Sequence, residues 1–307
     1  MNLASVQSFT RHFTRHFTRY VSPGHIFAAP AVLILSVFFF APVLGALAMS
    51  FTDFDIYALA DLKNLRFIGL GNYINLLMTP LFWKAFGNTC YFALVGAPLS
   101  IAVSMVMAMA LNVPGIGLKS LYRTALFAPY VATLVAAAVI FRYMLDFHYG
   151  WANQALRLAG LKPVDWLGDP HFSMPAIILF SVWKNFGYNM LILLAALQKI
   201  PDDLYESARV DGAGSWARFV HVTLPGIAPT LWMVSLLTVA GYFQLFAEPY
   251  VMTQGGPAQS TVSLLYFMYQ DGFKYWNLGH ASATAFVLFA ILIGISFLRP
   301  QSEGVMA

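Results

Sequence analysis

The sequence predicts an all-α integral membrane protein with six transmembrane helices. Of its 307 residues, 59% are hydrophobic and 10% are charged, whereas a soluble globular domain carries about 25% charged residues. Six apolar stretches also reach the ~20 residues that a helix needs to cross a bilayer. Lipid offers the backbone no hydrogen-bond partners, so these stretches must be helical. Transmembrane β-strands would alternate polar and apolar residues over about ten positions, which these stretches do not.

The six predicted spans cover most of the chain. They run approximately over residues 26–49, 86–111, 124–145, 174–197, 229–245 and 278–298. The fifth is the weakest, because Gln244 and Glu248 interrupt its end. The first has no small-residue cleavage site followed by a soluble domain, which favours a retained span over a signal peptide. The predicted domains are a tail over 1–25, a transmembrane domain over 26–298 and a second tail over 299–307.

Loop charges predict the orientation, since Lys and Arg collect on the cytoplasmic side. One set of loops and flanks carries a basic excess: Arg11, Arg15, Arg19, Lys119, Arg123, Lys199, Arg209, Arg218 and Arg299. The opposite loops offset their basic residues with seven aspartates: Asp53, Asp55, Asp61, Asp146, Asp165, Asp169 and Asp271. We therefore expect a multi-pass protein of the bacterial plasma membrane with both termini in the cytoplasm. The basic residues are dispersed, which argues against nucleic-acid binding.

The N-terminal tail repeats Thr-Arg-His-Phe with a period of four over residues 10–20. This period places arginines and phenylalanines on separate helical stripes, which favours a helix at the membrane surface. His12 and His16 have the spacing of two metal ligands, but no third ligand is near. Cys90 is the only cysteine, so no disulfide is possible within the chain. We predict no metal site.

The predicted loop over 198–229 has helix punctuation of its own. Pro201 suits a first helical position, and Asp202 and Asp203 follow where the helix dipole favours negative charge. Gly212 predicts a helix stop, Ser215 can cap a second helix, and Pro225 would end that helix. Glu206 and Arg209 are spaced to pair at i, i+3. The result is a cytoplasmic helix–turn–helix, whose small residues would let a partner backbone approach closely.

This loop resembles a known motif. Its matching positions are Glu206, Ser207, Ala208, Gly212, Val222, Leu224 and Pro225. Their spacing is that of the EAA loop (Glu-Ala-Ala, three residues, Gly, nine residues, Ile, one residue, Leu-Pro) of binding-protein-dependent ABC permeases. Ser207 and Val222 depart from the pattern but keep its size and character. The stretches 69–73, 182–201, 211–213 and 255–257 are similar to the carbohydrate-uptake branch, resembling the first permease subunit of maltose-type and glycerol-3-phosphate-type importers.

The resemblance implies a MetI-like fold in which the loop couples the permease to an ATP-hydrolysing subunit. The implied coupling residues are Glu206, Ser207, Ala208, Asp211, Gly212, Leu224 and Pro225. The chain lacks the Gly-x-x-x-x-Gly-Lys-Ser/Thr phosphate loop, so we expect it to bind no cofactor and not to be an enzyme. The implied partners are two ABC ATPase subunits that use ATP and Mg²⁺, a second homologous permease, an extracytoplasmic solute-binding protein and a carbohydrate substrate.

Residues of two spans combine aromatic rings with hydrogen-bonding groups, as a sugar site requires. These candidates for the substrate pathway are Lys184, Asn185, Tyr188, Asn189, Tyr242, Phe243, Gln244 and Phe246. Packing between helices with interhelical hydrogen bonds explains any one of them equally well. Lys184 is expensive to place inside a span, and either a structural partner or a role in the cavity would account for it.

Three other functions remain to be weighed. Import of a glycerol-3-phosphate-type polyol phosphate is the nearest alternative, because such permeases look alike. A stand-alone secondary transporter would show repeated halves or chains of intramembrane charges, and the sequence shows neither clearly. An intramembrane enzyme would need a nucleophile and base or a metal triad at membrane depth, and the chain lacks the His-Glu-x-x-His and Gly-x-Ser-x-Gly motifs.

Overall fold

A computed structural model describes residues 23–113, 115 and 117–297. The predicted tail repeat over 10–20 and the predicted tail over 299–307 lie outside these residues. Within the described part the chain is helical, and its only β-pairing is an isolated bridge between Thr52 and Phe67. The prediction of an all-α fold is confirmed.

The bounds of the helices follow in chain order. They are α2 (Pro23–Leu35), η1 (Ser36–Phe40), α3 (Ala41–Ser50), α4 (Ile56–Ala60), η2 (Leu62–Asn64), α5 (Gly71–Met78), α6 (Pro80–Asn112), α7 (Lys119–Val131), α8 (Leu134–Met144), α9 (Trp151–Leu158), α10 (Pro170–Leu197), α11 (Asp202–Val210), α12 (Ser215–Arg218), η3 (Phe219–Thr223), α13 (Leu224–Phe243), α14 (Ala247–Met252), α15 (Leu264–Tyr269), η4 (Gln270–Lys274) and α16 (Leu278–Ser296).

Among the described residues, five helical segments are long and apolar enough to span a membrane, and a bent pair brings the number to six. Four of the five agree with predicted spans to within several residues. The segment over Ser215–Met252 is longer than the predicted fifth span, because α12 and η3 continue into α13 and α14 follows after three residues.

The third predicted span, over 124–145, is broken into two helices, α7 and α8. The chain bends by 93° between α7 and α8, where Ala132 and Thr133 are extended. Pro129 has no N–H to donate in the turn before the break. The carbonyl of Tyr130 accepts a hydrogen bond from Lys184 Nζ of α10 at 2.7 Å. This side chain satisfies a backbone carbonyl in the last turn of α7.

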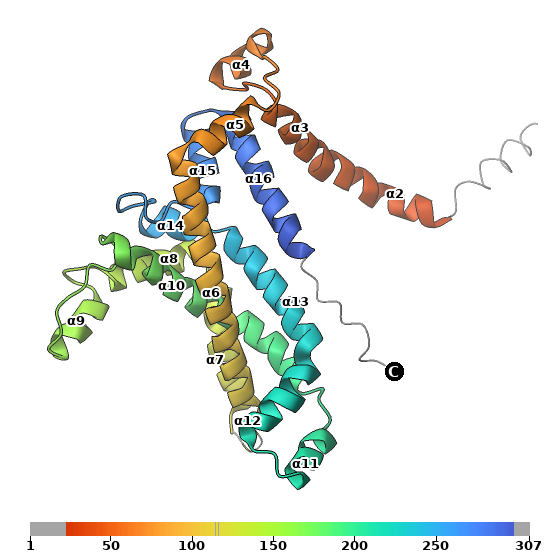
Figure 1. Ribbon diagram of the computed structural model, residues 1–307, viewed down its shortest axis with the longest axis vertical. Coiled ribbons are helices and arrows are strands. Elements are labelled where there is room, and N and C mark those ends of the chain that lie inside the picture. Colours follow the sequence, from red (N-terminus) through yellow and green to blue (C-terminus); the bar gives the residue numbers. More distant parts are fainter. Residues whose placement is uncertain (1–22, 114, 116, 298–307) are drawn as a thin grey trace, which may run out of the picture.

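The centre of the bundle is the long contact between α6 and α10, against which α13 packs on one side and α7 on another (Figure 1). α10 is the most buried of the spans. Gly187 explains how closely α7 approaches it, since a Cβ there would collide with the backbone of Leu126. α16 instead packs against α3 and α5.

The first span is the most exposed part of the described chain. Its residues from Phe27 to Ser50 form a continuous apolar helix, and none of its most apolar window is buried. In Figure 1, α2 extends away from the other helices. Only its second half, α3, packs against another helix, α16. The exposed apolar remainder needs lipid or another apolar protein surface around it.

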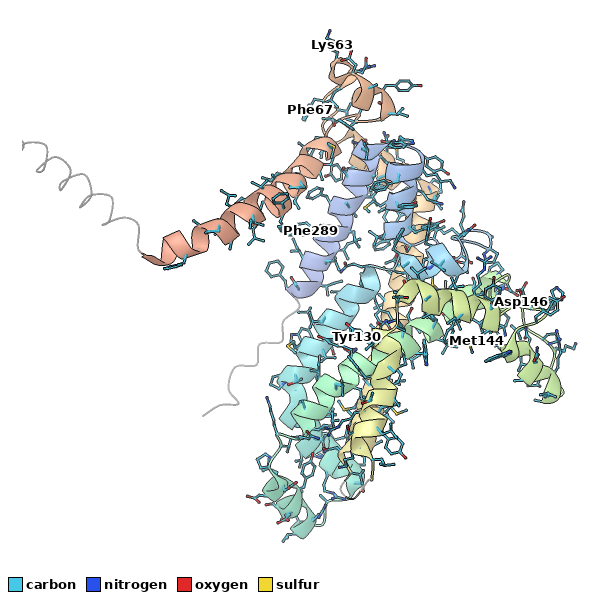
Figure 2. All side chains as sticks on the ribbon, turned by 180° about the vertical axis from the view of Figure 1, so that it is seen from behind. Lys63, Phe67, Tyr130, Met144, Asp146 and Phe289 are labelled. Atoms are coloured by element: carbon cyan, nitrogen blue, oxygen red, sulfur yellow. The ribbon has the colours of Figure 1, made fainter. Side chains whose placement is uncertain are left out.

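An arm built from α8 and α9 projects from the bundle. Figure 2 shows Tyr130 near the centre of the molecule and Met144 and Asp146 out on this arm. The arm is held by Asn153, which is fully buried. Its amide donates to the carbonyls of Asp146 and Val164 and its oxygen accepts from the Val164 N–H, so one side chain ties both ends of the loop together.

Candidate functional site

Two features lie where the sequence predicts function: the helical loop over 198–229 and a cavity between α10 and α13. The loop forms α11 and α12 at one end of the molecule, beyond the end of α7 (Figure 1). The extended backbone of Pro201 precedes α11, Asp202 and Asp203 occupy its first turn, and Arg209 occupies its last. Acidic residues at the N-terminus and a basic residue at the C-terminus stabilise the helix, because their charges are opposite to the helix dipole at each end.

Gly212 terminates α11 as predicted. Its φ is +78°, a conformation that costs little only for glycine. The N–H groups of Gly212 and Ala213 donate to the carbonyls of Arg209 and Ala208 at 3.0 and 2.9 Å, which satisfies the last turn of the helix. Gly212 is exposed, and a Cβ built on it would meet nothing within 4 Å. The position therefore requires glycine because of its backbone conformation and not because a larger side chain would collide.

Several details of the predicted loop are wrong. Gly214, not Ser215, is the residue that precedes α12. Pro225 does not end the second helix, because η3 continues directly into α13 and Pro225 lies in the first turn of α13, where a missing N–H is tolerated. Glu206 forms no salt bridge with Arg209 within the described residues. Both side chains are exposed instead.

The coupling residues of the sequence prediction fall into two groups. Glu206, Ser207, Asp211 and Gly212 are exposed on α11 and its turn, and Ala208 is half-buried. Leu224 and Pro225 lie apart from them at the start of α13. A hydrogen bond of 3.0 Å between the hydroxyls of Tyr205 and Thr223 joins the two groups. The coupling role of these residues stays a prediction.

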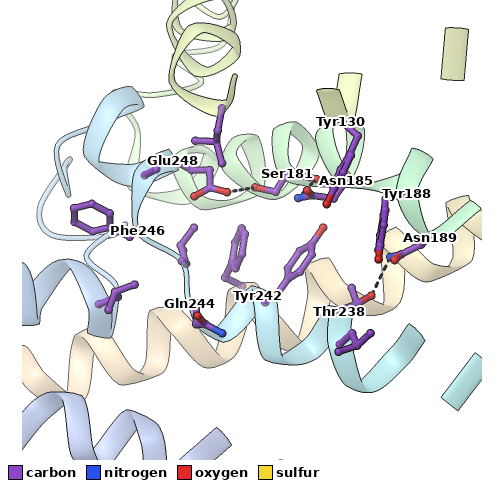
Figure 3. A pocket seen from close by; sticks show the side chains of 17 residues that line it. Tyr130, Ser181, Asn185, Tyr188, Asn189, Thr238, Tyr242, Gln244, Phe246 and Glu248 are labelled. Atoms are coloured by element: carbon purple, nitrogen blue, oxygen red, sulfur yellow. Dashed lines mark hydrogen bonds between the residues drawn. The ribbon is translucent and has the colours of Figure 1, made fainter. Parts of the chain in front are cut away.

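The cavity has a volume of about 550 Å³. Its walls come mainly from α10, α13 and the turn into α14 (Figure 3). The polar residues of its walls are Ser181, Asn185, Asn189, Thr238, Gln244 and Glu248. Ser181, Asn185 and Asn189 recur every four residues, which places them on one face of α10. A cavity of this size, with a few polar groups among apolar walls, is typical of a small-molecule site.

Hydrogen bonds hold part of the polar wall in place. Asn189 Nδ2 donates to Thr238 Oγ1 at 2.9 Å, and Thr238 donates to the carbonyl of Val234 at 2.7 Å. This chain joins α10 to α13. On the other side, Ser181 Oγ donates to Glu248 Oε1 at 3.5 Å, which joins α10 to α14.

Aromatic rings form the rest of the wall. Tyr130 stacks on Tyr188 with ring centroids 4.9 Å apart, and Phe92 stacks on Tyr242 at 5.0 Å. Phe246 also lines the cavity, and its ring contacts Tyr250 outside it at 5.5 Å. The Tyr242 hydroxyl is buried, and no residue in the described part of the chain meets the geometry of a hydrogen bond to it.

Six of the eight residues predicted for the substrate pathway line this cavity: Asn185, Tyr188, Asn189, Tyr242, Gln244 and Phe246. Phe243 does not line it and lies in the apolar core. Lys184 does not line it either, since its ammonium binds the Tyr130 carbonyl and lies 5.4 Å from the centre of the Tyr130 ring. This geometry favours the structural alternative for Lys184. Whether the other six contact substrate remains a prediction.

Four polar residues of the cavity wall are not among those predicted from the sequence: Tyr130, Ser181, Thr238 and Glu248. Ser181 could have been found, because it lies one helical turn before Asn185. The sequence prediction uses Glu248 only to place the end of the fifth span. A carboxylate next to an apolar run is rare enough to indicate a functional position.

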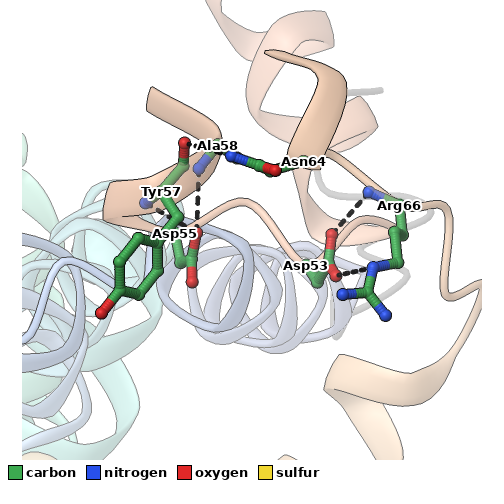
Figure 4. A network of polar contacts seen from close by, with 6 residues as sticks. All are labelled: Asp53, Asp55, Tyr57, Ala58, Asn64 and Arg66. Atoms are coloured by element: carbon green, nitrogen blue, oxygen red, sulfur yellow. Dashed lines mark hydrogen bonds and ion pairs between the residues drawn. The ribbon is translucent and has the colours of Figure 1, made fainter. Parts of the chain in front are cut away.

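Polar contacts order the loop at the opposite end of the molecule from α11 (Figure 4). Asp53 accepts from the Arg66 N–H at 2.6 Å, and its other oxygen lies 3.7 Å from Arg66 Nε. Asp55 caps α4 by accepting from the Tyr57 N–H at 2.9 Å. Asn64 donates to the Tyr57 carbonyl at 3.2 Å. These bonds fold the connection between α3 and α5 into a compact projection.

Asp169 begins α10 at the edge of its span. Its carboxylate accepts from the His171 N–H at 2.8 Å and lies 3.0 Å from His171 Nδ1. The backbone hydrogen bond from His171 lowers the pKa of Asp169, and the hydrogen bond to the imidazole lowers it further. Among the described residues, no three His, Cys, Asp or Glu side chains come together as a metal site.

Comparison with known proteins identifies the family. Residues 26–300 match the family described as "Binding-protein-dependent transport system inner membrane component". The chain belongs to this family. Its fold class is therefore as predicted, and it is a transport component of the inner membrane and not an enzyme.

Individual relatives match over nearly the full chain. The lactose transport system permease protein LacF of Rhizobium radiobacter is 35% identical over 281 residues, 90% of this chain and 92% of that protein. The arabinooligosaccharides permease AraP of Bacillus subtilis is 31% identical over 91% of this chain and 88% of its own length. The sn-glycerol-3-phosphate permease UgpA of Yersinia pestis is 32% identical over 90% of this chain and 92% of its own length.

A solved structure has the same fold. It is a bacterial alginate ABC transporter in complex with an alginate pentasaccharide-bound periplasmic protein, and it matches with a TM-score of 0.75. The match covers 94% of both chains at 22% sequence identity.

Proposed function

We propose that this chain is the permease subunit of an ATP-driven importer for a sugar or oligosaccharide and forms its translocation pathway. The observation that carries this proposal is the cavity between α10 and α13, whose walls combine stacked aromatic rings with amide and hydroxyl groups. This combination suits a solute with apolar C–H faces and many hydroxyls. Relatives named for lactose and arabinooligosaccharides support the same substrate class.

The proposed partners are two ABC ATPase subunits, a second homologous permease and an extracytoplasmic binding protein. The exposed surface of α11 supports the first of these, since Glu206, Ser207 and Asp211 project from a helix that buries little against its own chain. The exposed apolar helix that precedes α3 is compatible with a second permease as well as with lipid. ATP and Mg²⁺ would bind only to the ATPase subunits.

The proposed orientation places α11 and α12 in the cytoplasm. Lys199, Arg209 and Arg218 lie on or beside these helices, in agreement with the distribution of positive charge expected there. With six crossings, both termini would share that side. The loop around Asp53 and Arg66 would then face the extracytoplasmic binding protein.

The helices suggest how the loop could act on the cavity. From Ser215 to Phe243 the backbone is helical without interruption, passing from α12 through η3 into α13. Thr238 and Tyr242 near its far end line the cavity, and the Tyr205–Thr223 bond ties α11 to its near end. Closure of two ATPase subunits would displace α11 and α12, and the continuous helix would move one cavity wall relative to α10. This motion would alternate access to the cavity.

Gentle purification of the tagged chain from its native membrane tests the proposal. We expect a P-loop ATPase and a homologous permease to co-purify, as identified by mass spectrometry. A chain that purifies alone and moves solute in liposomes without ATP would instead be a secondary transporter.

A further inference from the structure

The cavity wall contains one carboxylic acid and no basic side chain. Among the residues that line it, Glu248 carries the only carboxylate, and there is no lysine, arginine or histidine. Relatives of this chain are named both for an uncharged sugar and for the anion sn-glycerol-3-phosphate, so homology leaves the charge of the solute open. The charged groups in the cavity wall determine which solute charge the cavity can accommodate.

Glu248 is fixed in place by its surroundings. It is 9% exposed and lies in the first turn of α14. Ser181 donates to one of its oxygens. Figure 3 shows this pair in the cavity wall, opposite Tyr242. A carboxylate has about four acceptor positions and no donor when ionised, so it can accept further hydrogen bonds from solute hydroxyls.

The nearest base is occupied. Lys184 lies one turn from Ser181 on α10, but its ammonium donates to the Tyr130 carbonyl at 2.7 Å and faces the Tyr130 ring. It is buried and does not line the cavity. No salt bridge joins it to Glu248 within the described residues. Releasing it to a solute would leave the Tyr130 carbonyl unpaired at the break between α7 and α8.

We propose that this cavity accepts uncharged saccharides and excludes anionic ones, with Glu248 as the group that selects between them. The inference rests on the proposed function as a sugar permease and narrows its substrate class. A phosphate, sulfonate or uronate needs ammonium, guanidinium or N–H donors, and here it would meet a carboxylate in a poorly solvated site. A sugar hydroxyl in the same position would donate a hydrogen bond to Glu248.

Two disaccharides of the same ring geometry test the selection. Cellobiose is uncharged, and cellobiuronate carries one carboxylate. Their binding is measured by saturation-transfer NMR or calorimetry on the purified complex in nanodiscs, without the binding protein, whose own selectivity would otherwise dominate. We expect cellobiose to bind at least about tenfold more tightly than cellobiuronate, because like charges repel strongly at short range in a protein interior.

Two variants identify the group responsible. Glu248→Gln keeps the size of the side chain and removes its charge, and it should reduce the difference between the two ligands to below about threefold. Glu248→Asp keeps the charge and should preserve most of the difference. Equal binding of both ligands by the native complex, or an unchanged difference in Glu248→Gln, would overturn the inference. Failure to bind either disaccharide, in a complex that still hydrolyses ATP, would instead refute the sugar substrate on which the inference rests.

Discussion

Replacing Gly212 with alanine tests the proposed role of the turn after α11. Gly212 has a φ of +78° and no atom within 4 Å of a built Cβ. The substitution therefore introduces no collision and acts only through the backbone, where a residue with a Cβ pays about 1–2 kcal/mol in the left-handed region. A change of that size lowers the population of the native turn by roughly 5–30-fold relative to its alternatives.

Gly214 provides a matched control two residues away. Its φ is −68°, an ordinary value for alanine, and it also has nothing within 4 Å of a built Cβ. Gly214→Ala adds the same methyl group to the same turn without backbone strain. Any difference between the two variants therefore reports the conformation after α11 and not the added bulk.

The assay measures how much ATPase subunit remains with the tagged chain during purification, together with ATP-driven sugar uptake. We expect Gly212→Ala to lose most of both and Gly214→Ala to retain them. Both variants should be inserted in the membrane at the native level, as measured by quantitative blotting. Equal retention of the ATPase by the two variants would refute the role assigned to this turn.

Three further substitutions test other parts of the structure. Gly187→Ala should destabilise the protein by about 1–3 kcal/mol through collision with the backbone of Leu126, as a lower Tm in detergent, whereas Gly87→Ala in open space should not lower it. Lys184→Met should lower the Tm by removing a charged hydrogen bond worth about 1.5–3 kcal/mol and leave sugar affinity unchanged; lost affinity with an unchanged Tm would contradict this. Asp169 has a lowered pKa, so its contribution to stability is complete above the ordinary carboxyl pKa of about 4 and fades as the pH falls below it. Asp169→Asn should therefore weaken the acid sensitivity of the Tm between about pH 4 and 2, and an identical pH profile would contradict the assignment.

The sequence was sufficient for features that depend on neighbouring residues. Apolar length alone predicts α6 and α10, because a spanning helix satisfies its own backbone. Pro201 and Gly212 predict the two ends of α11, because each residue restricts or permits backbone conformation locally. The second helix of the loop was less predictable, since Pro225 is compatible either with a helix end or with the first turn of a new helix.

Features that depend on distant contacts could not be predicted. The chain stays apolar on both sides of the break at 132–133, and the partner of the freed carbonyl is Lys184, more than fifty residues later. Glu248 enters the cavity wall only because α14 folds back against α8 and α10. No local pattern of residues specifies that return, so the sequence marks Glu248 as an unusual position but does not place it in the cavity wall.

Sugar uptake into proteoliposomes tests the central claim most directly. The complex of this chain with its co-purified subunits is reconstituted, and entry of radiolabelled saccharide is measured with the binding protein outside and ATP inside. The account predicts uptake that requires both ATP and the binding protein and that falls in Gly212→Ala. Uptake at the same rate without ATP, or uptake by this chain alone, would contradict it.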